Sequence, residues 1–508
     1  MRTKTRTRKK GKFYITTAID YPNADPHLGH AYEKLCADVI ARWHRLLGEE
    51  VFFLTGTDEH GLKIMRSAQK AGLTPKEFVD KQAAKFIELC KLWNISNDRF
   101  IRTTEEAHIK VAQEIFNKIY KKGDIYLGQY SGPYCTDCET FYTEKDLKNG
   151  LCPIHAKKCE IVKEESYFFR LGKYRDFILD YMEKNKVSII PDSKKEEIRN
   201  RLKQGLDELS VSRTSFDWGV PVPINPKHVQ YVWIDALINY ISGIDYPGER
   251  FKKFWPADVH IIGKDIVWHH TVIWWSILKS AGIKPPKTVL VHGFILSESG
   301  QKMSKSTGNV TDPIELAKKY NVDAVRYYLI RETPFGEDGF FSEQKLIERN
   351  NTELANDLGN LANRILALIS QKSQGLVPKG HLDKEIAAKM NIEKIKKHFE
   401  RFELHLAIAE VMAFVKQCNQ YINEKEPWKK SGAELNDLLY TLSECLHAIA
   451  VMLSPFMPET ADKIAKALKT DVCSIEHIFS GKCLTQKKVE NKCILFEKIL
   501  VNEKAKTF

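Results

Sequence analysis

The 508-residue sequence has no run of about twenty apolar residues, the length that a helix needs to cross a membrane. Its densest apolar stretch, 265–283, is interrupted by Asp265, His269 and His270. No apolar segment typical of a secretory signal follows the basic N-terminus, and no internal repeat or low-complexity segment is found. A membrane-spanning or secreted protein is therefore not expected, and the composition favours a globular, cytoplasmic protein.

A disulfide framework is not expected either. The eleven cysteines are an odd number in a long chain without a signal pattern, which is typical of a reducing compartment. The net charge is +12, but residues 1–12 hold seven Lys or Arg, and setting these seven aside leaves +5. We interpret 1–12 as a solvated basic tail, because net charge alone does not predict a polyanionic partner.

Alternating strand and helix patterns predict an α/β fold. A β-branched and aromatic strand pattern at 12–19 precedes apolar residues at helical spacing, and a second buried strand pattern begins at Glu50. This order predicts a doubly wound, Rossmann-type parallel sheet. Helical periodicity dominates after Asn350 and predicts a helix bundle. The expected divisions are a tail (1–12), a first Rossmann half (13–115), an insertion (116–230), a second Rossmann half (231–296), a loop region (297–349) and a helical domain (350–508).

The segment His27-Leu28-Gly29-His30 falls where the first strand turns into a helix. Ligands of doubly wound sheets bind near such helix N-termini, whose backbone N–H groups attract phosphate. Gly29 lets a ligand approach the backbone closely. His27 and His30 are three residues apart, so both can face a phosphate oxygen. The motif alone is equally compatible with two helix-capping histidines.

A second motif, Lys302-Met303-Ser304-Lys305-Ser306, follows a strand pattern much later in the chain. Gly300 and Gly308 bracket it, which is typical of a mobile loop. Two lysines on such a loop could close on a polyphosphate. The alternative, an exposed basic loop, is disfavoured by the presence of the histidine motif in the same chain.

Together the two motifs resemble the signature pair of the class I aminoacyl-tRNA synthetases. Further segments resemble the methionyl-tRNA synthetases within that class. These are AIDYPN, LTGTDEHG, YVWIDALINY, IIGKDIVWHH, VHGF, TPFGEDGFFSE and LANDLGNLANR, which lie between about Phe13 and Trp428. The resemblance implies a ligase that activates L-methionine with ATP and Mg2+ and transfers it to the 3′-terminal adenosine of tRNA(Met), the initiator included.

The resemblance also implies roles for individual residues. The catalytic residues would be His27, His30, Lys302 and Lys305; the ATP-binding residues Gly29, Gly263, Asp265, His292 and Lys305; and the methionine-binding residues Ile19, Tyr21, Asp58, Trp233, Tyr240 and His270. Asp58 would hold the substrate ammonium and Asp265 the ribose hydroxyls. Aromatic rings contact a thioether sulfur favourably. Each aromatic residue by itself is equally compatible with core packing. Asp20 and Leu237 stand where proline is common in this family, which affects the expected shape of the pocket.

The insertion contains Cys135-x2-Cys138 and, thirteen residues on, Cys152-x2-His155. This spacing predicts a tetrahedral Zn2+ knuckle with three thiolates and one imidazole. Cys159 is a possible alternative to His155. Four protein ligands leave no open position, so the metal is expected to be structural, as it is in the family that the chain resembles.

In the helical domain, Asn360 and Arg364 are four residues apart and share one helix face. Trp428 follows Pro427. Such side chains can read base edges and stack on unpaired bases, and the resemblance implies that they read the CAU anticodon. A helix cap and a buried tryptophan are the alternative interpretations. Many relatives carry a further dimerising tRNA-binding module for which the chain has no room, so a monomer is expected.

Three other functions share part of these features: another class I synthetase (for leucine, valine, isoleucine or cysteine), a small adenylyltransferase, and a non-catalytic tRNA-binding relative. Class I synthetases for leucine, valine or isoleucine carry a large editing insertion, whereas only about 115 residues separate the Rossmann halves here. A cysteine enzyme needs a metal in the amino-acid pocket, and the first strand offers no thiol. A small adenylyltransferase lacks the helical domain. A non-catalytic tRNA-binding relative is expected to have lost one of the two motifs, and both are intact.

Overall fold

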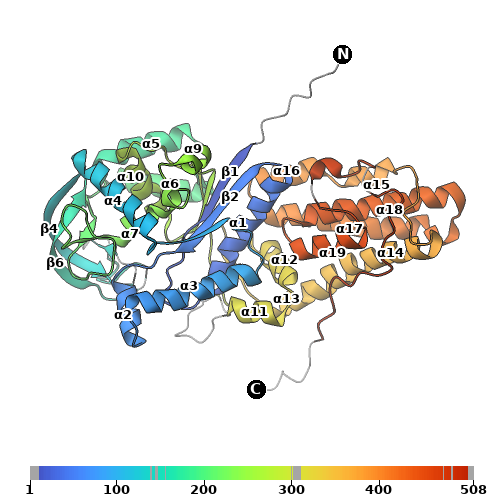
Figure 1. The fold of residues 1–508 in the computed structure, drawn as a ribbon, viewed down its shortest axis with the longest axis horizontal. Coiled ribbons are helices and arrows are strands. Elements are labelled where there is room, and N and C mark those ends of the chain that lie inside the picture. The colour runs from blue at the N-terminus through green and yellow to red at the C-terminus, as the bar shows by residue number, and fades with distance from the viewer. Residues whose placement is uncertain are drawn as a thin grey trace, which may run out of the picture.

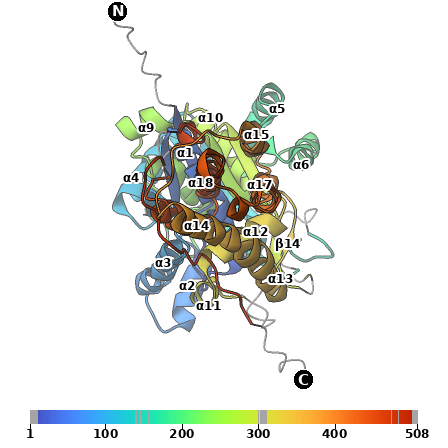
Figure 2. The ribbon, with the colours of Figure 1, turned by 90° about the vertical axis from the view of Figure 1, so that its right-hand side faces the viewer.

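The computed structural model describes residues 11–137, 140–142, 147–154, 156–298, 300, 311–472, 474–481 and 484–500. Two lobes lie end to end along the long axis: an α/β lobe and a helical lobe built from the C-terminal part of the chain (Figure 1). Figure 2 views the molecule from the helical end, with α14 (Asn360–Lys372), α17 (Leu404–Lys425) and α18 (Gly432–Leu453) in front of the α/β lobe. Within the ranges described, no helix is long and apolar enough to cross a membrane.

A six-stranded, wholly parallel sheet forms the centre of the α/β lobe, in the order β3-β2-β1-β11-β12-β7. Its strands are β1 (Lys12–Thr17), β2 (Glu50–Thr57), β3 (Arg99–Arg102), β7 (Ile189–Ile190), β11 (Val259–Gly263) and β12 (Thr288–His292). The strand order reverses at β1, which has β2 on one side and β11 on the other. A crevice opens at the carboxyl ends of strands at such a reversal. The predicted doubly wound α/β fold is confirmed.

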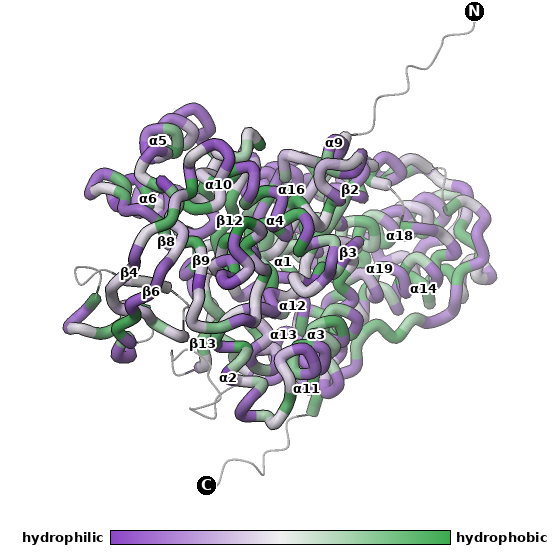
Figure 3. Tube along the Cα trace, turned by 60° about the vertical axis from the view of Figure 1, so that its left-hand side comes forward, coloured by the Kyte–Doolittle hydropathy of each residue, from purple (hydrophilic) through white to green (hydrophobic). Residues whose placement is uncertain are grey.

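Helices cover this sheet because its strands are apolar on both faces, as parallel strands generally are. All five residues of β11 and of β12 are buried. The surrounding helices are α1 (Leu28–Leu46), α2 (Leu62–Lys70), α3 (Pro75–Leu92), α4 (Glu106–Lys121), α7 (Val232–Leu237), α8 (Asn239–Ser242), α9 (Glu249–Phe254), the π-helix η3 (His269–Ile273) and α10 (Trp274–Ser280). Figure 3 shows apolar segments gathered in the interior and hydrophilic ones on outer helices such as α5 (Arg175–Lys184) and α6 (Asp192–Lys203).

The predicted insertion, 116–230, forms an antiparallel ribbon and also adds to the central sheet. The ribbon consists of β4 (Ile125–Cys135) and β6 (Glu160–Phe169), flanked by β5 (Thr140–Phe141) and β8 (Leu209–Ser210), and β9 (Ser212–Arg213) pairs with β10 (Val229–Gln230). Between them lie the 3-10 helix η2 (Leu171–Tyr174), α5 (Arg175–Lys184) and α6 (Asp192–Lys203). Because β7 pairs with β12, the later part of this segment packs into the Rossmann layer instead of projecting from it.

A short stretch between the lobes carries β13 (Ile295–Leu296), α11 (Pro313–Lys319), α12 (Val322–Glu332), β14 (Gly339–Phe340) and α13 (Glu343–Arg349). The helical lobe contains η5 (Asn350–Gly359), α14 (Asn360–Lys372), α15 (Lys384–Lys389), α16 (Ile392–Glu400), α17 (Leu404–Lys425), η6 (Pro427–Lys429), α18 (Gly432–Leu453), α19 (Pro458–Ala467) and η7 (Ile475–His477). The predicted helical domain is confirmed.

The two lobes share one core, which places the C-terminal helices firmly against α1. Arg326 on α12 donates to Asp38 on α1 (2.6 Å), to the carbonyl of Trp93 (2.9 Å) and to that of Phe456 (2.8 Å), and its side chain is fully buried. Trp43 stacks on Phe399 of α16 at 4.0 Å between ring centroids. A buried ion pair of this kind is costly unless both partners are satisfied, and here the guanidinium and the carboxylate each have several partners.

Candidate functional site

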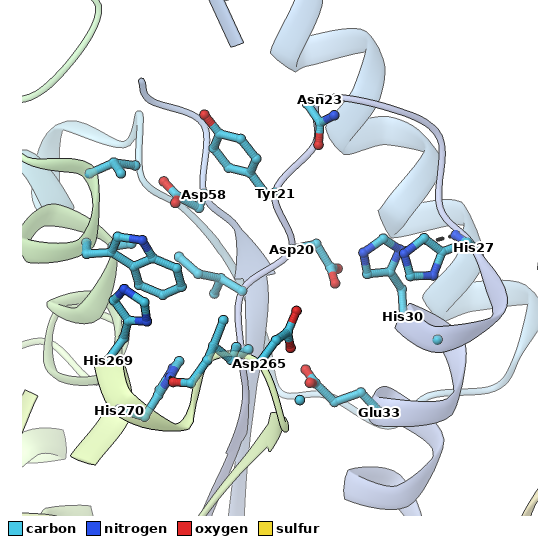
Figure 4. Close-up of a pocket in the computed structure, with 18 of the residues that line it drawn as sticks. Asp20, Tyr21, Asn23, His27, His30, Glu33, Asp58, Asp265, His269 and His270 are labelled. Atoms are coloured by element: carbon cyan, nitrogen blue, oxygen red, sulfur yellow. Dashed lines mark hydrogen bonds between the residues drawn. The ribbon is translucent and has the colours of Figure 1, made fainter. Parts of the chain in front are cut away.

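A cavity of about 470 Å³ opens at the carboxyl ends of β1, β2, β11 and β12, where the sheet order predicts it. Figure 4 shows its two sides. One side is aromatic and is formed by α7, α8 and η3. The other side is polar and is formed by the start of α1 and the turns after β11 and β12. Every predicted catalytic, ATP-binding and methionine-binding residue that the structure describes lines this cavity: Ile19, Tyr21, His27, Gly29, His30, Asp58, Trp233, Tyr240, Gly263, Asp265, His270 and His292.

The two motif histidines stand at the first turn of α1, as predicted. Their rings stack at 3.7 Å between centroids, and the backbone N–H of His27 donates to Nδ1 of His30 (3.1 Å). Because Nδ1 of His30 accepts that bond, the proton of a neutral His30 lies on Nε2, which can donate to an anion. A Cβ added at Gly29 would lie 3.0 Å from Cε1 of His27, so glycine leaves room for this stack. The helix N-terminus adds its own attraction for negative charge.

The polar side contains a pair that sequence reasoning missed. Glu33, one helical turn after His30, accepts from Nε2 of His292 (2.9 Å), whose Nδ1 donates to the carbonyl of Gly293 (2.7 Å). Burial lowers the pKa of His292, but the hydrogen bond and charge of Glu33 outweigh it, so this pKa is raised. His292 was predicted to bind ATP. Both ring nitrogens of His292 are bonded within the protein. The group that can contact a ligand in the cavity is therefore the Glu33 carboxylate, which His292 holds in place.

Asp265 lies on the turn after β11. Its carboxylate occupies the space that a side chain at position 263 would need, so this position requires glycine. A Cβ at Gly263 would lie 2.9 Å from Oδ1 of Asp265. The next side chain, Lys264, pairs with Asp338 at 2.8 and 2.7 Å, and Asp338 also accepts from the backbone N–H of Phe294 (2.8 Å). These bonds join the turns after β11 and β12 and hold Asp265 at the rim of the cavity.

Asp20, where the family often has proline, is paired inside the protein. Its carboxylate lies 2.5 Å from Nζ of Lys34, four residues after His30 on α1, and both side chains are almost completely buried. Burial raises the pKa of Asp20, and the lysine charge opposes that effect. The backbone N–H of Asp20 donates to the carbonyl of Gly56, and that of Asp58 donates to the carbonyl of Asp20 (both 2.8 Å). Asp20 thus ties the ends of β1 and β2 to the motif helix.

The aromatic side forms a neutral, mostly apolar slot. Trp233 stacks on His269 at 3.9 Å between centroids. Tyr240 donates its hydroxyl to Nε2 of His270 (2.7 Å), whose Nδ1 donates to the carbonyl of Ile266 (3.0 Å). Burial lowers the pKa of His269 to about 3 and that of His270 to about 4, so both rings are uncharged at neutral pH. An uncharged aromatic slot suits a flexible apolar side chain with a soft sulfur atom.

A second concavity, of about 460 Å³, lies on the helical lobe. It is lined by Asn356, Asp357, Asn360, Asn363, Arg364, Lys416 and Asn419. Two of the three predicted anticodon residues, Asn360 and Arg364, therefore belong to one amide-rich surface, and Arg364 donates to Asn423 (2.6 Å). The third, Trp428, is 45% exposed on η6, which argues against a core-packing role.

The predicted metal ligands fall only partly within the described residues. Cys135, at the end of β4, and Cys152 are both buried in one small cluster with Tyr142 and Cys159. Cys138 and His155 lie outside the described residues, so the complete ligand set is not seen. In the ranges that the structure describes, no group of three His, Cys, Asp or Glu side chains could hold a metal ion. The three buried thiols of this cluster have the donor chemistry that Zn2+ prefers.

The lysine motif at 302–306 also lies outside the described residues. The segments before and after it are described. β13 precedes it and pairs with β14, and Ile295 at the start of β13 lines the cavity. β13 therefore lies at the cavity rim, and in the sequence five residues separate its end from the start of the motif.

Comparison with known proteins agrees with this geometry. Residues 13–158 and 143–366 match the family model described as tRNA synthetases class I (M), and residues 383–506 match the anticodon-binding domain of tRNA ligase. The methionine–tRNA ligase of Caldanaerobacter subterraneus is 45% identical, covering 97% of this chain and 80% of that protein. The corresponding ligase of Brucella suis is 45% identical, covering 90% and 92%. Mycobacterium tuberculosis methionyl-tRNA synthetase in complex with methionyl-adenylate superposes with a TM-score of 0.91 at 40% identity, covering 96% of this chain and 99% of that one.

Proposed function

Because the chain belongs to the methionyl-tRNA synthetases of class I, we propose that its sheet-edge cavity forms methionyl-adenylate and that its helical lobe reads the anticodon. The overall reaction is the ATP-dependent ligation of methionine to tRNA. The observation that carries the residue assignment is the single cavity that joins the histidine motif, Asp58 and the aromatic slot.

The reaction has two steps. In the first, a carboxylate oxygen of methionine attacks the α-phosphorus of ATP in line, the bond to the bridging oxygen breaks, and pyrophosphate leaves. In the second, a hydroxyl of the 3′-terminal ribose of tRNA attacks the activated carbonyl, and AMP leaves. Phosphoryl-type transfers depend mainly on positioning and on electrostatic stabilisation of the developing charge.

We assign stabilisation of the negative charge that develops on the phosphates to the start of α1. His27 and His30 donate to the phosphate oxygens that gain charge, and the N-terminus of α1 adds backbone donors. Lys302 and Lys305 neutralise the departing pyrophosphate. Asp265 holds the ribose hydroxyls, with Glu33 beside it on the same polar side. Mg2+ bound with ATP supplies further neutralisation of the phosphates.

We assign methionine recognition to the opposite side. Asp58 holds the ammonium group. Ile19, Tyr21, Trp233, Tyr240 and His270 enclose the side chain, and all five line the cavity. The neutral state of the slot histidines favours this role, because a charged ring would demand a polar occupant.

The tRNA assignment rests on the exposed residues of the helical lobe. Asn360 and Arg364 would hydrogen-bond base edges in the amide-rich concavity, and Trp428 would stack on an unpaired base. The initiator and elongator tRNAs of methionine share the CAU anticodon, so both are substrates. We propose that the enzyme acts as a cytoplasmic monomer.

Replacing Trp428 with alanine is expected to weaken charging of tRNA by roughly 5- to 150-fold, because one base–aromatic stack contributes about 1–3 kcal/mol. Methionine-dependent ATP–pyrophosphate exchange, run beside the other nineteen amino acids, should be unaffected and should remain selective for methionine. Trp428→Phe keeps an aromatic face and should recover most of the charging activity. Equal losses in exchange and charging, with a lower melting temperature, would identify Trp428 as a packing residue.

A structural Zn2+ is proposed for the insertion, held by Cys135, Cys138, Cys152 and His155. Metal analysis of the purified chain should find one zinc per chain, and Cys138→Ser should lose it. The fourth ligand is decided by comparing His155→Ala with Cys159→Ala: only the first should release the metal. Retention of zinc by His155→Ala together with its loss from Cys159→Ala would replace the imidazole by a fourth thiolate. Metal-free protein from zinc-supplemented growth would contradict the site altogether.

A further inference from the structure

A buried aspartate, Asp235 on α7, joins three segments that meet behind the aromatic slot. Its side chain is fully buried. Oδ2 accepts from Nδ1 of His60 (2.6 Å), and Oδ1 accepts from Nε2 of His108 (2.7 Å). His60 lies on the turn after β2 and His108 on α4. None of the three side chains lines the cavity, so they act on the substrate only through their neighbours.

The hydrogen bonds define the state of this cluster. A carboxylate only accepts, so Nδ1 of His60 and Nε2 of His108 both carry protons. The remaining nitrogen of His108, Nδ1, lies 2.8 Å from the hydroxyl of Ser242, which donates to it when the ring is neutral. Burial raises the pKa of Asp235, but His60 and His108 outweigh it and lower that pKa to about 2. The aspartate is therefore ionised, and both of its oxygens are engaged.

Two members of the cluster, His60 and Asp235, are each two residues from a predicted methionine contact. His60 follows Asp58 on the turn after β2, and Asp235 follows Trp233 on α7. Two further residues fix the turn after β2 through Glu59. Trp218 donates to the carbonyl of Glu59 (2.7 Å), and Arg102 donates to the Glu59 carboxylate (2.6 and 2.9 Å). Asp58 and Trp233 come from separate segments, the turn after β2 and helix α7, and the hydrogen bond between His60 and Asp235 connects these two segments.

We propose that Asp235 is a positioning residue for methionine: it fixes Asp58 relative to Trp233, and so sets the distance between the ammonium site and the side-chain slot. This inference rests on the methionine roles proposed above for those two residues. The ATP side of the cavity, which is built from α1 and the turns after β11 and β12, does not depend on this link. A substitution in the cluster should therefore raise the KM for methionine and leave the KM for ATP nearly unchanged.

Asp235→Asn is expected to raise the KM for methionine about tenfold in exchange assays, because small displacements of binding groups are costly. The KM for ATP and kcat at saturating methionine should change less than about threefold. Asp124→Asn is the matched control. Asp124 is also buried, has a pKa lowered to about 2, and accepts from Lys173, Tyr174 and Ser280, but it does not line the cavity or contact either predicted methionine residue. It should lower the melting temperature without altering the KM for methionine.

A second pair of variants keeps the test independent of folding. Glutamine can place an amide N–H near the position of a histidine Nε2, whereas leucine cannot donate. His108→Gln should therefore retain a near-native KM for methionine, and His108→Leu should raise it. Equal changes in the KM values for methionine and ATP, or no difference between the glutamine and leucine variants, would overturn the positioning role. If instead Asp58→Asn leaves methionine binding unchanged, the proposed methionine site itself fails, whatever Asp235→Asn does.

Discussion

Replacing His30 with alanine is expected to slow formation of methionyl-adenylate by about 100- to 1,000-fold, the usual effect of removing one donor aimed at developing charge. The imidazole stands at the N-terminus of α1, and its Nδ1 already accepts from the backbone of His27. In the mechanism proposed above, its Nε2–H donates to the phosphate. The affinity for methionine should stay close to native, because the aromatic slot and Asp58 lie on the other side of the cavity (Figure 4).

Single-turnover adenylation with excess enzyme measures this effect directly. His44→Ala provides the control, since His44 is on the same helix but pairs with Glu49 (2.6 Å) and stacks on Phe13, away from the cavity. His30→Gln restores a donor near the Nε2 position and should recover part of the rate. An unchanged adenylation rate in His30→Ala would remove His30 from the chemical step, and a similar loss in His44→Ala would point to a damaged helix.

Replacing Asp58 with asparagine is expected to raise the KM for methionine by roughly 10- to 150-fold, because a hydrogen bond to a charged group contributes about 1.5–3 kcal/mol. The carboxylate is mostly buried at the cavity wall, on a turn whose backbone is held by Asp20. Asparagine has nearly the same shape, so the turn should remain in place. The change removes the negative charge that we propose balances the substrate ammonium, and the KM for ATP should stay close to native.

Competition by 4-(methylthio)butanoate, which is methionine without its amino group, measures how much the ammonium group contributes to binding. The native protein should prefer methionine strongly over this analogue, and Asp58→Asn should lose that preference by weakening methionine alone. Asp25→Asn removes a different carboxylate from the same cavity, one paired with Lys85. A similar rise in KM for both variants would mean that general charge, and not a specific contact, governs methionine binding.

The insertion illustrates a limit of sequence patterns. The loss of the strand–helix rhythm after residue 116 indicated a separate segment, and the ribbon of β4 and β6 fits that expectation. The two-residue strand β7 gave no usable pattern, because so short a segment carries no periodicity. It joins the central sheet only through its pairing with β12, about a hundred residues later. Short edge strands of this kind are defined by their partner.

The sequence by itself determined the elements on which the chemistry depends. A strand followed by a histidine–glycine–histidine turn and a helix is a local pattern, and the structure places those rings at the first turn of α1. The amphipathic C-terminal helices are local patterns too. The resemblance of whole segments then indicated the substrate, because a long ordered set of residues is far more specific than any single aromatic side chain.

Tertiary structure alone decided which polar side chains meet. Glu33 and His292 are 259 residues apart, and His60 and Asp235 are 175 apart. No periodicity relates such positions, because their contact depends on strand order and on the path of every intervening segment. The same holds for exposure: a tryptophan after a proline can be buried or free, and only the end of α17 leaves Trp428 at the surface. Local sequence specifies elements through backbone periodicity, whereas pairs between distant elements exist only once the sheet has been assembled.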